Sequence, residues 1–267
     1  MQTSTSTSRW SFLRRSAAVL TALCMNLGAG AAPLDLGAAI DVAGRQRMLS
    51  QRIVKAYCQV GMQVGTPESQ AQLGSAVQRF ERQLILLKQT VREPAARALL
   101  ARLSTQWVPF RRIATGPATK EGARALTARD EGLLRTANEL VLAIQQASAT
   151  PQARLVNVSG RQRMLSQRMA KLYMLRAWGV DTPALRDEID IASNEFAGAL
   201  ASLRATVENT PEIANELDAV SLQWEWFTAA IALQGAESYT LVVAAASESI
   251  LDSMERITGL YAALTPR

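Results

Sequence analysis

Histidine is absent from this chain of 267 residues, and cysteine occurs only at Cys24 and Cys58. Without histidine there is no imidazole to ligate a metal or to act as a general base. Two cysteines are too few for a cysteine metal cluster. Paired acids such as Asp187 and Glu188 are typical of a solvated helix surface. We therefore expect no metal site, no cofactor and no enzymatic activity.

Long apolar runs are also missing, apart from one short segment near the N-terminus. Three arginines precede an apolar run at about 16–27, and Ala29 and Ala31 follow it. This order is typical of a secretory signal peptide, so we expect residues 1–31 to be cleaved and the protein to be periplasmic. The run is too short to span a membrane comfortably, and no later segment approaches about 20 apolar residues. We expect no membrane span in the mature chain, in which Cys58 would be the only cysteine.

The excess of positive charge is small and scattered. The formal net charge of +6 falls to about +3 without the leader, which carries three arginines and no acids. Lysine and arginine are spread through acid-containing segments, with no basic stripe and no aromatic platform. Nucleic acid is therefore not an expected partner.

An internal repeat is the strongest feature that is present. Residues 44–52 and 160–168 are identical, and both read Gly-Arg-Gln-Arg-Met-Leu-Ser-Gln-Arg. Weaker matches continue downstream, from Lys55 with Lys171 to Phe110 with Phe227. A repeat of about 115 residues predicts two copies of one structural unit.

Each repeat reads as four helices. In the first, Pro67, Pro94 and Pro117 separate segments with apolar residues at helical spacing, and Thr66 and Thr210 are predicted helix N-caps. Nothing shows the alternation of a strand, and short connections favour antiparallel neighbours. We predict an all-α protein of two tandem antiparallel four-helix bundles after the signal peptide, at residues 32–149 and 150–267.

The repeated motif places polar residues on one face of the first helix. At 100° per residue, Gly44, Arg47, Met48, Gln51 and Lys55 lie together, while Leu49 and its apolar neighbours face their own bundle. The second copy repeats this face with Gly160, Arg163, Met164 and Gln167. Glycine permits close approach of another helix, and a guanidinium offers paired N–H donors that match a planar anion. This face is a candidate anion site.

An arginine on a helix surface is ordinarily a solvated charge, so a single Arg-x-x-x-Gln pair does not indicate a ligand site. The two copies, however, keep nine consecutive residues while their other helices keep only sparse matches. Core packing tolerates hydrophobic swaps and would not hold Arg, Gln and Ser fixed. Two interpretations stay open: an anion site, or a structural or protein-interaction bundle whose motif only holds two helices together.

Two aromatic pairs recur in the repeats: Trp107 with Phe110, and Trp224 with Phe227. Their helical spacing predicts core anchors. Trp224 and Trp226 cannot both face one core, so we expect Trp226 to be partly exposed. Cys58 is predicted to be a small buried side chain.

At the motif the sequence resembles the periplasmic sensor domain shared by NarX-type nitrate/nitrite sensor kinases and PilJ-type chemotaxis transducers. The family pattern Ile-Asn-x-Ala-Gly-x-x-Arg-Met-x-Ser-x-Arg corresponds to residues 40–52 and 156–168, with Asp41 in place of the usual Asn and Val156 in place of Ile. The resemblance implies that nitrate binds between the arginines that precede the methionines, here Arg47 and Arg163. Gly44, Met48, Gly160 and Met164 would shape the pocket.

The resemblance also implies a role. A family domain with no membrane span and no kinase in the chain cannot itself carry a signal across a membrane. We therefore expect an extracytoplasmic binding protein for a small anion such as nitrate or nitrite, which passes its bound state to a membrane sensor kinase or chemoreceptor. Because both motif copies lie in one chain, they are predicted to form a single shared site.

Overall fold

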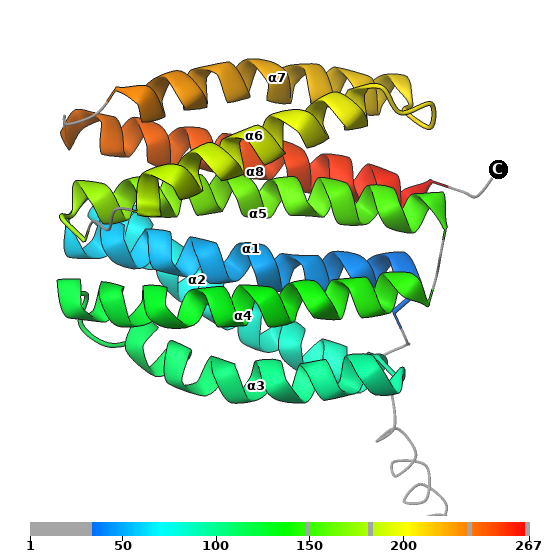
Figure 1. Cartoon of the computed structure of the whole chain (residues 1–267), viewed down its shortest axis with the longest axis horizontal. Helices are drawn as coiled ribbons and strands as arrows, with labels where there is room; N and C mark the ends of the chain where they lie inside the picture. The colour runs from blue at the N-terminus through cyan, green and yellow to red at the C-terminus, as the bar shows by residue number, and fades with distance from the viewer. Residues whose placement is uncertain (1–33, 148–149, 181–183, 234–236, 265–267) are drawn as a thin grey trace, which may run out of the picture. The chain divides into compact units, whose positions relative to one another are not determined.

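Eight helices make up the part of the chain that the structure, a computed structural model, describes: residues 34–147, 150–180, 184–233 and 237–264 (Figure 1). They are α1 (Leu36–Gly61), α2 (Thr66–Thr90), α3 (Pro94–Ala114), α4 (Lys120–Gln146), α5 (Pro151–Ala177), α6 (Ala184–Arg204), α7 (Pro211–Ala232) and α8 (Glu237–Ala263). No strand occurs within these ranges, so the predicted all-α class is confirmed. The predicted signal peptide lies outside the described residues.

Threonine caps and prolines set most of the helix starts. The hydroxyls of Thr119, Thr150 and Thr210 accept hydrogen bonds from the backbone N–H three residues further on, at 3.0, 3.1 and 3.3 Å. The cap predicted at Thr66 is wrong, because Gly65 is the N-cap of α2 and Thr66 is already helical. Gly65 has φ +54°, a conformation that glycine adopts without strain.

The helices form two four-helix bundles, α1–α4 and α5–α8, as predicted from the repeat. In the first, α1 packs on α2 and α4, and α3 packs on α4. The second repeats these contacts, since α5 packs on α6 and α8, and α7 packs on α8. The boundaries predicted at 32–149 and 150–267 stay a prediction.

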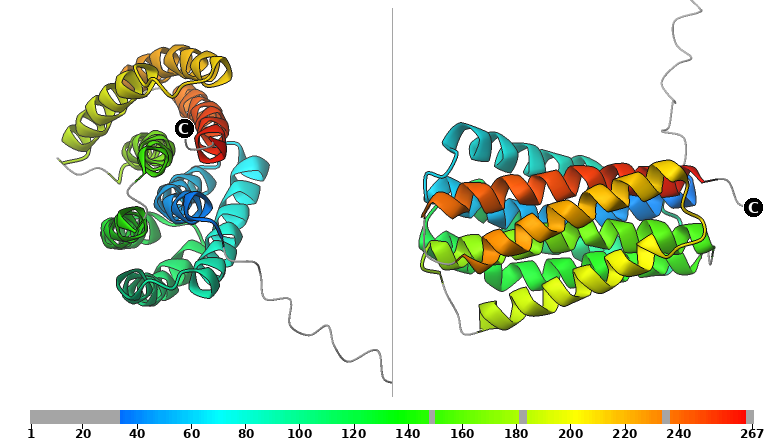
Figure 2. Two further views of the ribbon diagram at one scale, coloured as in Figure 1. Left: turned by 90° about the vertical axis from the view of Figure 1, so that its right-hand side faces the viewer. Right: turned by 90° about the horizontal axis from the view of Figure 1, so that it is seen from above.

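The most extensive helix contact joins the two repeats rather than lying within either. The helices α1 and α5 run side by side, with the remaining helices on their outer sides (Figures 1 and 2). At one end of this contact the ring of Trp178 packs over Gly61, where a Cβ atom would lie only 2.2 Å from Cη2 of the ring. Polar side chains of α1 such as Gln46, Ser50 and Lys55 are fully buried among the helices that surround it.

The core of each bundle contains a stacked aromatic pair. Phe80 stacks on Trp107 with ring centroids 3.9 Å apart, and Phe196 stacks on Trp224 at 4.2 Å. The predicted core role is confirmed for Trp107, while Trp224 is half-buried and packs against the core; the burial of Cys58 is confirmed as well. Trp226 is 77% exposed, which confirms the prediction that it faces outward.

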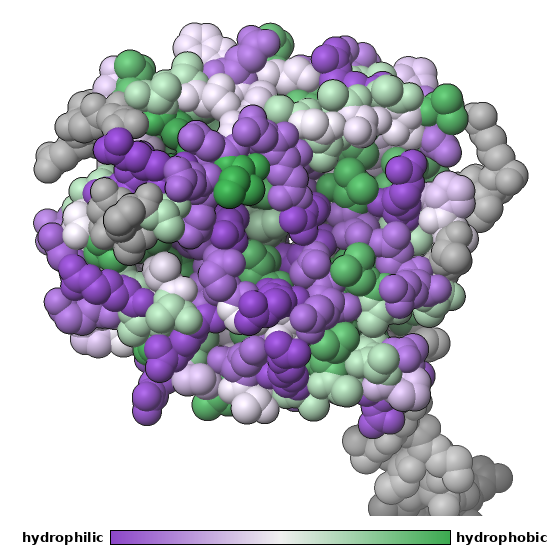
Figure 3. All heavy atoms as spheres, in the orientation of Figure 1, coloured by the Kyte–Doolittle hydropathy of each residue, from purple (hydrophilic) through white to green (hydrophobic). Residues whose placement is uncertain are grey.

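The face of the molecule seen in Figure 3 is mostly hydrophilic, with apolar side chains scattered singly or in small groups. Among the described helices, none is both long and apolar enough to cross a membrane. Within the same residues, no three His, Cys, Asp or Glu side chains are grouped closely enough to hold a metal ion.

Candidate functional site

The two motif copies meet where α1 packs on α5. A Cβ atom built on Gly160 would lie 3.0 Å from Nη2 of Arg163 and 3.6 Å from Nη2 of Arg47. On Gly44 the corresponding distances are 3.3 Å to Arg47 and 3.6 Å to Arg163. Since both Nη2 atoms lie within 3.6 Å of one point, they are at most about 7 Å apart. The missing side chains of the two glycines thus provide the space that the two guanidiniums occupy.

Arg47 is 1% exposed and is held by neutral groups. Its Nη1 donates to Oδ1 of Asn138 at 3.0 Å and to Oδ1 of Asn157 at 2.9 Å, while its Nε has no hydrogen-bond partner. Burial, together with the nearby positive charges of Arg161 and Arg163, lowers the pKa of Arg47 to about 9. The group is still protonated at neutral pH, so a charge that lacks a direct carboxylate partner is held inside the protein.

Arg163 is fully buried as well, but carboxylates surround it. Its Nη2 donates to Oδ1 of Asp41 at 2.6 Å, and its Nη1 lies 3.5 Å from Oε2 of Glu255. Arg45 pairs with the same two acids, at 3.0 Å to Asp41 and 2.8 Å to Glu255. Nε and Nη1 of Arg163 make no hydrogen bond, so this guanidinium also retains unused donors.

The predicted site residues Gln51 and Gln167 belong to a second buried polar layer. Nε2 of Gln51 donates to Asp130 at 2.8 Å, and Nε2 of Gln167 donates to the carbonyl of Ser247 at 3.0 Å. Their role as anion ligands stays a prediction, since their amide N–H groups are directed to α4 and α8.

Two lysines complete this layer. Nζ of Lys171 lies 2.6 Å from Oδ2 of Asp130, and both side chains are buried. Nζ of Lys55 contacts Ser247 at 3.2 Å and Glu248 at 2.5 Å. Burial lowers the pKa of Lys55 to about 8 against the opposing effect of Glu248. The sequence predicted Lys55 on the same helix face as Arg47 and matched it with Lys171, but it did not predict the burial of these lysines or their acidic partners.

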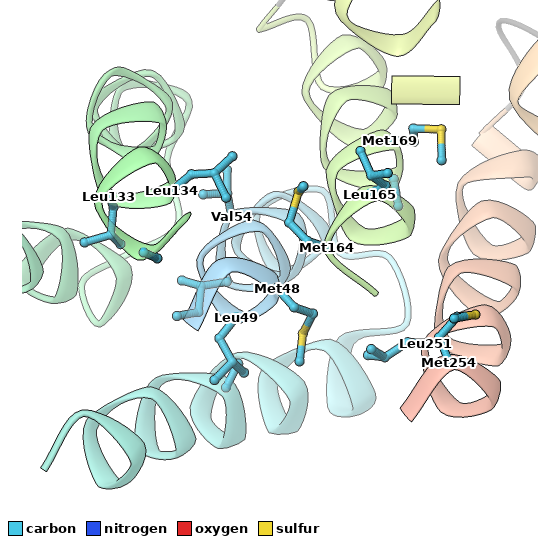
Figure 4. Packing of buried hydrophobic residues seen from close by; sticks show 14 of the residues in the cluster. Met48, Leu49, Val54, Leu133, Leu134, Met164, Leu165, Met169, Leu251 and Met254 are labelled. Atoms are coloured by element: carbon cyan, nitrogen blue, oxygen red, sulfur yellow. The ribbon is translucent and has the colours of Figure 1, made fainter. Parts of the chain in front are cut away.

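Met48 and Met164, also predicted to shape the pocket, are buried members of the hydrophobic core. Figure 4 shows Met164 extending from α5 toward α1, and Met48 extending from α1 on the side of α2. Met164 therefore supports the packing of α5 on α1 and Met48 that of α1 on α2, and their contact with a ligand stays a prediction.

Sequence reasoning missed four neighbours of the arginines: Asp41, Asn138, Asn157 and Glu255. Asp41 and Asn157 occupy equivalent places three residues before the motif glycines, so the repeat itself carried a signal for them. Asn138 and Glu255 come from α4 and α8, where no identity between the repeats marks them.

A groove of about 410 Å³ lies between α4, α5 and α6, beside Arg47. Asn138 lines this groove and also accepts the hydrogen bond from Arg47. Arg161, another lining residue, donates to Asn138 at 3.4 Å and pairs with Glu195 of α6. The groove brings solvent to the immediate neighbours of Arg47.

Comparison with known proteins finds two matches to one family, described as the N-terminal region of type IV pili methyl-accepting chemotaxis transducers. The matches cover residues 34–131 and 144–250, more than half of the chain, and each contains one copy of the motif. No curated protein and no solved structure gives a significant match. The resemblance inferred from the motif is confirmed, and it applies to both repeats.

Proposed function

Because the chain belongs to the family of type IV pili methyl-accepting chemotaxis transducer N-terminal domains, we propose that it is an extracytoplasmic sensor module for a small anion, nitrate or nitrite. One anion binds between Arg47 and Arg163, and the bound state is presented to a membrane signalling partner, a sensor kinase or chemoreceptor. The observation that carries this proposal is the pair of buried guanidiniums, at most about 7 Å apart at the contact between the repeats.

The energetics favour an anion at this place. Two like charges at most about 7 Å apart repel by at least about 2 kcal/mol at an effective dielectric constant of 20, before Asp41 and Glu255 offset the charge of Arg163. An anion between them offsets the repulsion and can accept charge-assisted hydrogen bonds. Nε of Arg47 and Nε of Arg163 make no hydrogen bond, and Nη1 of Arg163 has only the long ion-pair contact with Glu255, so these donors are available for a planar acceptor such as nitrate.

The position of the site couples binding to the arrangement of the repeats. Arg47 is carried by α1 and Arg163 by α5, and these two helices form the main contact between the bundles. An anion that draws the guanidiniums together therefore favours one setting of α1 against α5 over another. That setting is what a membrane partner would read.

Thermal unfolding with sodium nitrate, nitrite or chloride at constant ionic strength tests the proposal. A ligand present at 100 times its dissociation constant stabilises by about 2.7 kcal/mol, which is about 5–10 °C in Tm for a protein of this size. Arg47→Ala and Arg163→Ala should each abolish the shift, because the site is shared. Arg47→Lys keeps the charge but loses the planar fork, so it should fold and bind more weakly.

The matched control is Arg102→Ala, since Arg102 forms an exposed ion pair with Glu139 far from the motif in the sequence. This variant should keep the full response to nitrate. If both single variants at Arg47 and Arg163 keep full-strength binding, the shared site is refuted.

The second candidate is a structural or protein-interaction bundle without a ligand. One observation favours it: Arg163 already has two resident carboxylates, Asp41 and Glu255. In that case the polar layers only fix how α1 and α5 pack. No change in Tm with any of the three anions would support this candidate and refute the sensor proposal.

A further inference from the structure

The surroundings of Arg47 and Arg163 differ although the two arginines are equivalent in the repeats. Asp41 and Asn157 occupy the same place in the two motif copies. Arg52 pairs with Glu248 in the same way that Arg168 pairs with Glu131, so these two glutamates are equivalent as well. Seven residues after each stand Glu255 and Asn138. Arg163 contacts the carboxylates of Asp41 and Glu255. At the two equivalent positions Arg47 contacts the carboxamides of Asn157 and Asn138.

The half of the site around Arg163 is neutral. Arg45 and Arg163 each contact Asp41 and Glu255, at distances from 2.6 to 3.5 Å, so two positive and two negative charges form a closed ring. Arg79, 41% exposed, approaches Glu255 only at 3.9 Å and is screened by solvent at the edge of the ring.

The half around Arg47 has one positive charge too many. Arg47 and Arg161 lie here, and within the described residues Glu195 is the one carboxylate that pairs with either of them. Glu195 is paired directly with Arg161, so the uncompensated charge is that of Arg47. Asn138 and Asn157 satisfy hydrogen bonds but supply no charge. An unpaired buried charge is costly, and a monovalent anion would relieve that cost.

We infer that Asp41 and Glu255 are built-in counter-ions that occupy the Arg163 half of the site and set its specificity to one monovalent anion, bound mainly by Arg47. The inference rests on the proposed function and deepens it. It assigns the choice between monovalent and divalent anions to the difference between Asp41 and Asn157. Asn at both positions would leave two surplus positive charges, and Asp at both would leave none.

Two nearly isosteric substitutions test the inference, with nitrate and sulfate as probes at constant ionic strength. Asn157→Asp gives Arg47 the partner that Arg163 already has, so nitrate should bind at least about tenfold more weakly and the Tm without anion should rise. Asp41→Asn removes a counter-ion, so the affinity ratio of sulfate to nitrate should rise by about tenfold or more.

The exchange variant, with Asp41→Asn and Asn157→Asp together, keeps the net charge of the site. Nitrate binding should return to within about tenfold of the parent protein, with Arg163 now the main ligand. This variant also keeps the test valid if Asp41→Asn alone does not fold. The matched controls are Asp218→Asn, in an exposed ion pair with Arg204, and Asn215→Asp, at an exposed position of α7. Neither control should change the affinity for nitrate or the affinity ratio of sulfate to nitrate.

The outcomes separate this inference from the proposed function. If the parent protein binds nitrate but Asn157→Asp binds it equally well, or Asp41→Asn keeps the same sulfate to nitrate ratio, the inference is overturned and the sensor proposal stands. If the parent responds to no anion, the sensor proposal fails. In that event a higher Tm of Asn157→Asp than of its control still supports the surplus charge at Arg47, and an unchanged Tm overturns it.

Discussion

The ion pair between Lys171 of α5 and Asp130 of α4 provides a strong test of how the two repeats are held together. Nζ of Lys171 lies 2.6 Å from Oδ2 of Asp130, and the side chains are 1% and 0% exposed. The other acid near this lysine, Glu131, is 3.8 Å away and half-exposed. Asp130→Asn should therefore leave a buried ammonium without an adequate partner. Breaking such a pair costs about 3–5 kcal/mol, which for this protein is a loss of about 6–20 °C in Tm.

The assay is chemical denaturation of the purified protein without anion, with calorimetry for Tm. Replacing both partners, by Asp130→Leu with Lys171→Met, should cost far less than the single change, because no unpaired charge is left. Asp218→Asn makes the same chemical change in an exposed pair and should shift stability by about 1 kcal/mol or less. A loss under about 1 kcal/mol for Asp130→Asn would refute the reasoning.

Two further predictions concern Gly61 and Lys55, which both lie in α1. Gly61→Ala places a methyl group 2.2 Å from the ring of Trp178, and the resulting overpacking of about 1–3 kcal/mol should exceed the gain of about 1 kcal/mol in helix propensity. In contrast, a Cβ atom at Gly74 would have nothing within 4 Å, so Gly74→Ala should stabilise the protein. Chemical denaturation of both variants checks this, and equal stabilisation by the two changes would contradict it. The folded-state pKa of Lys55, about 8, lies below its ordinary value of 10.5, so between these values the unfolded chain binds more protons and stability should rise with pH. Lys55→Met should lose this rise, and the same slope in both proteins would refute the assignment.

The fold could be predicted from the sequence because the repeat, the helix starts and the apolar spacing agreed with one another. Thr119, Thr150 and Thr210 are local signals, since the hydroxyl and the N–H that it caps lie three residues apart. The start of α2 was misplaced by one residue because Gly65 can adopt a positive φ that makes it the cap. The choice between a helix that starts at Thr66 and one that starts a residue later is decided by the conformation of the preceding turn.

The candidate site was predicted only in part. Arg47 and Arg163 stood out because the motif is repeated, and the two glycines indicated where helices approach. The groups that set the charge of the site, Asn138 and Glu255, come from other helices, and their approach depends on how α4 and α8 cross α1 and α5. The burial of Lys55 and Lys171 was missed for the same reason, because a lysine on a helix is ordinarily solvated until another helix covers it.

The presence of both repeats in one chain explains how an asymmetric site can exist. In a symmetric homodimer, the residue equivalent to position 41 is the same in both subunits, so both arginines would face Asp or both would face Asn. In a single chain the two copies can differ, and here they do, with Asp41 beside Arg163 and Asn157 beside Arg47. The site can therefore have a single surplus positive charge. Two identical subunits could not produce this value, because a change at position 41 would occur in both of them at once.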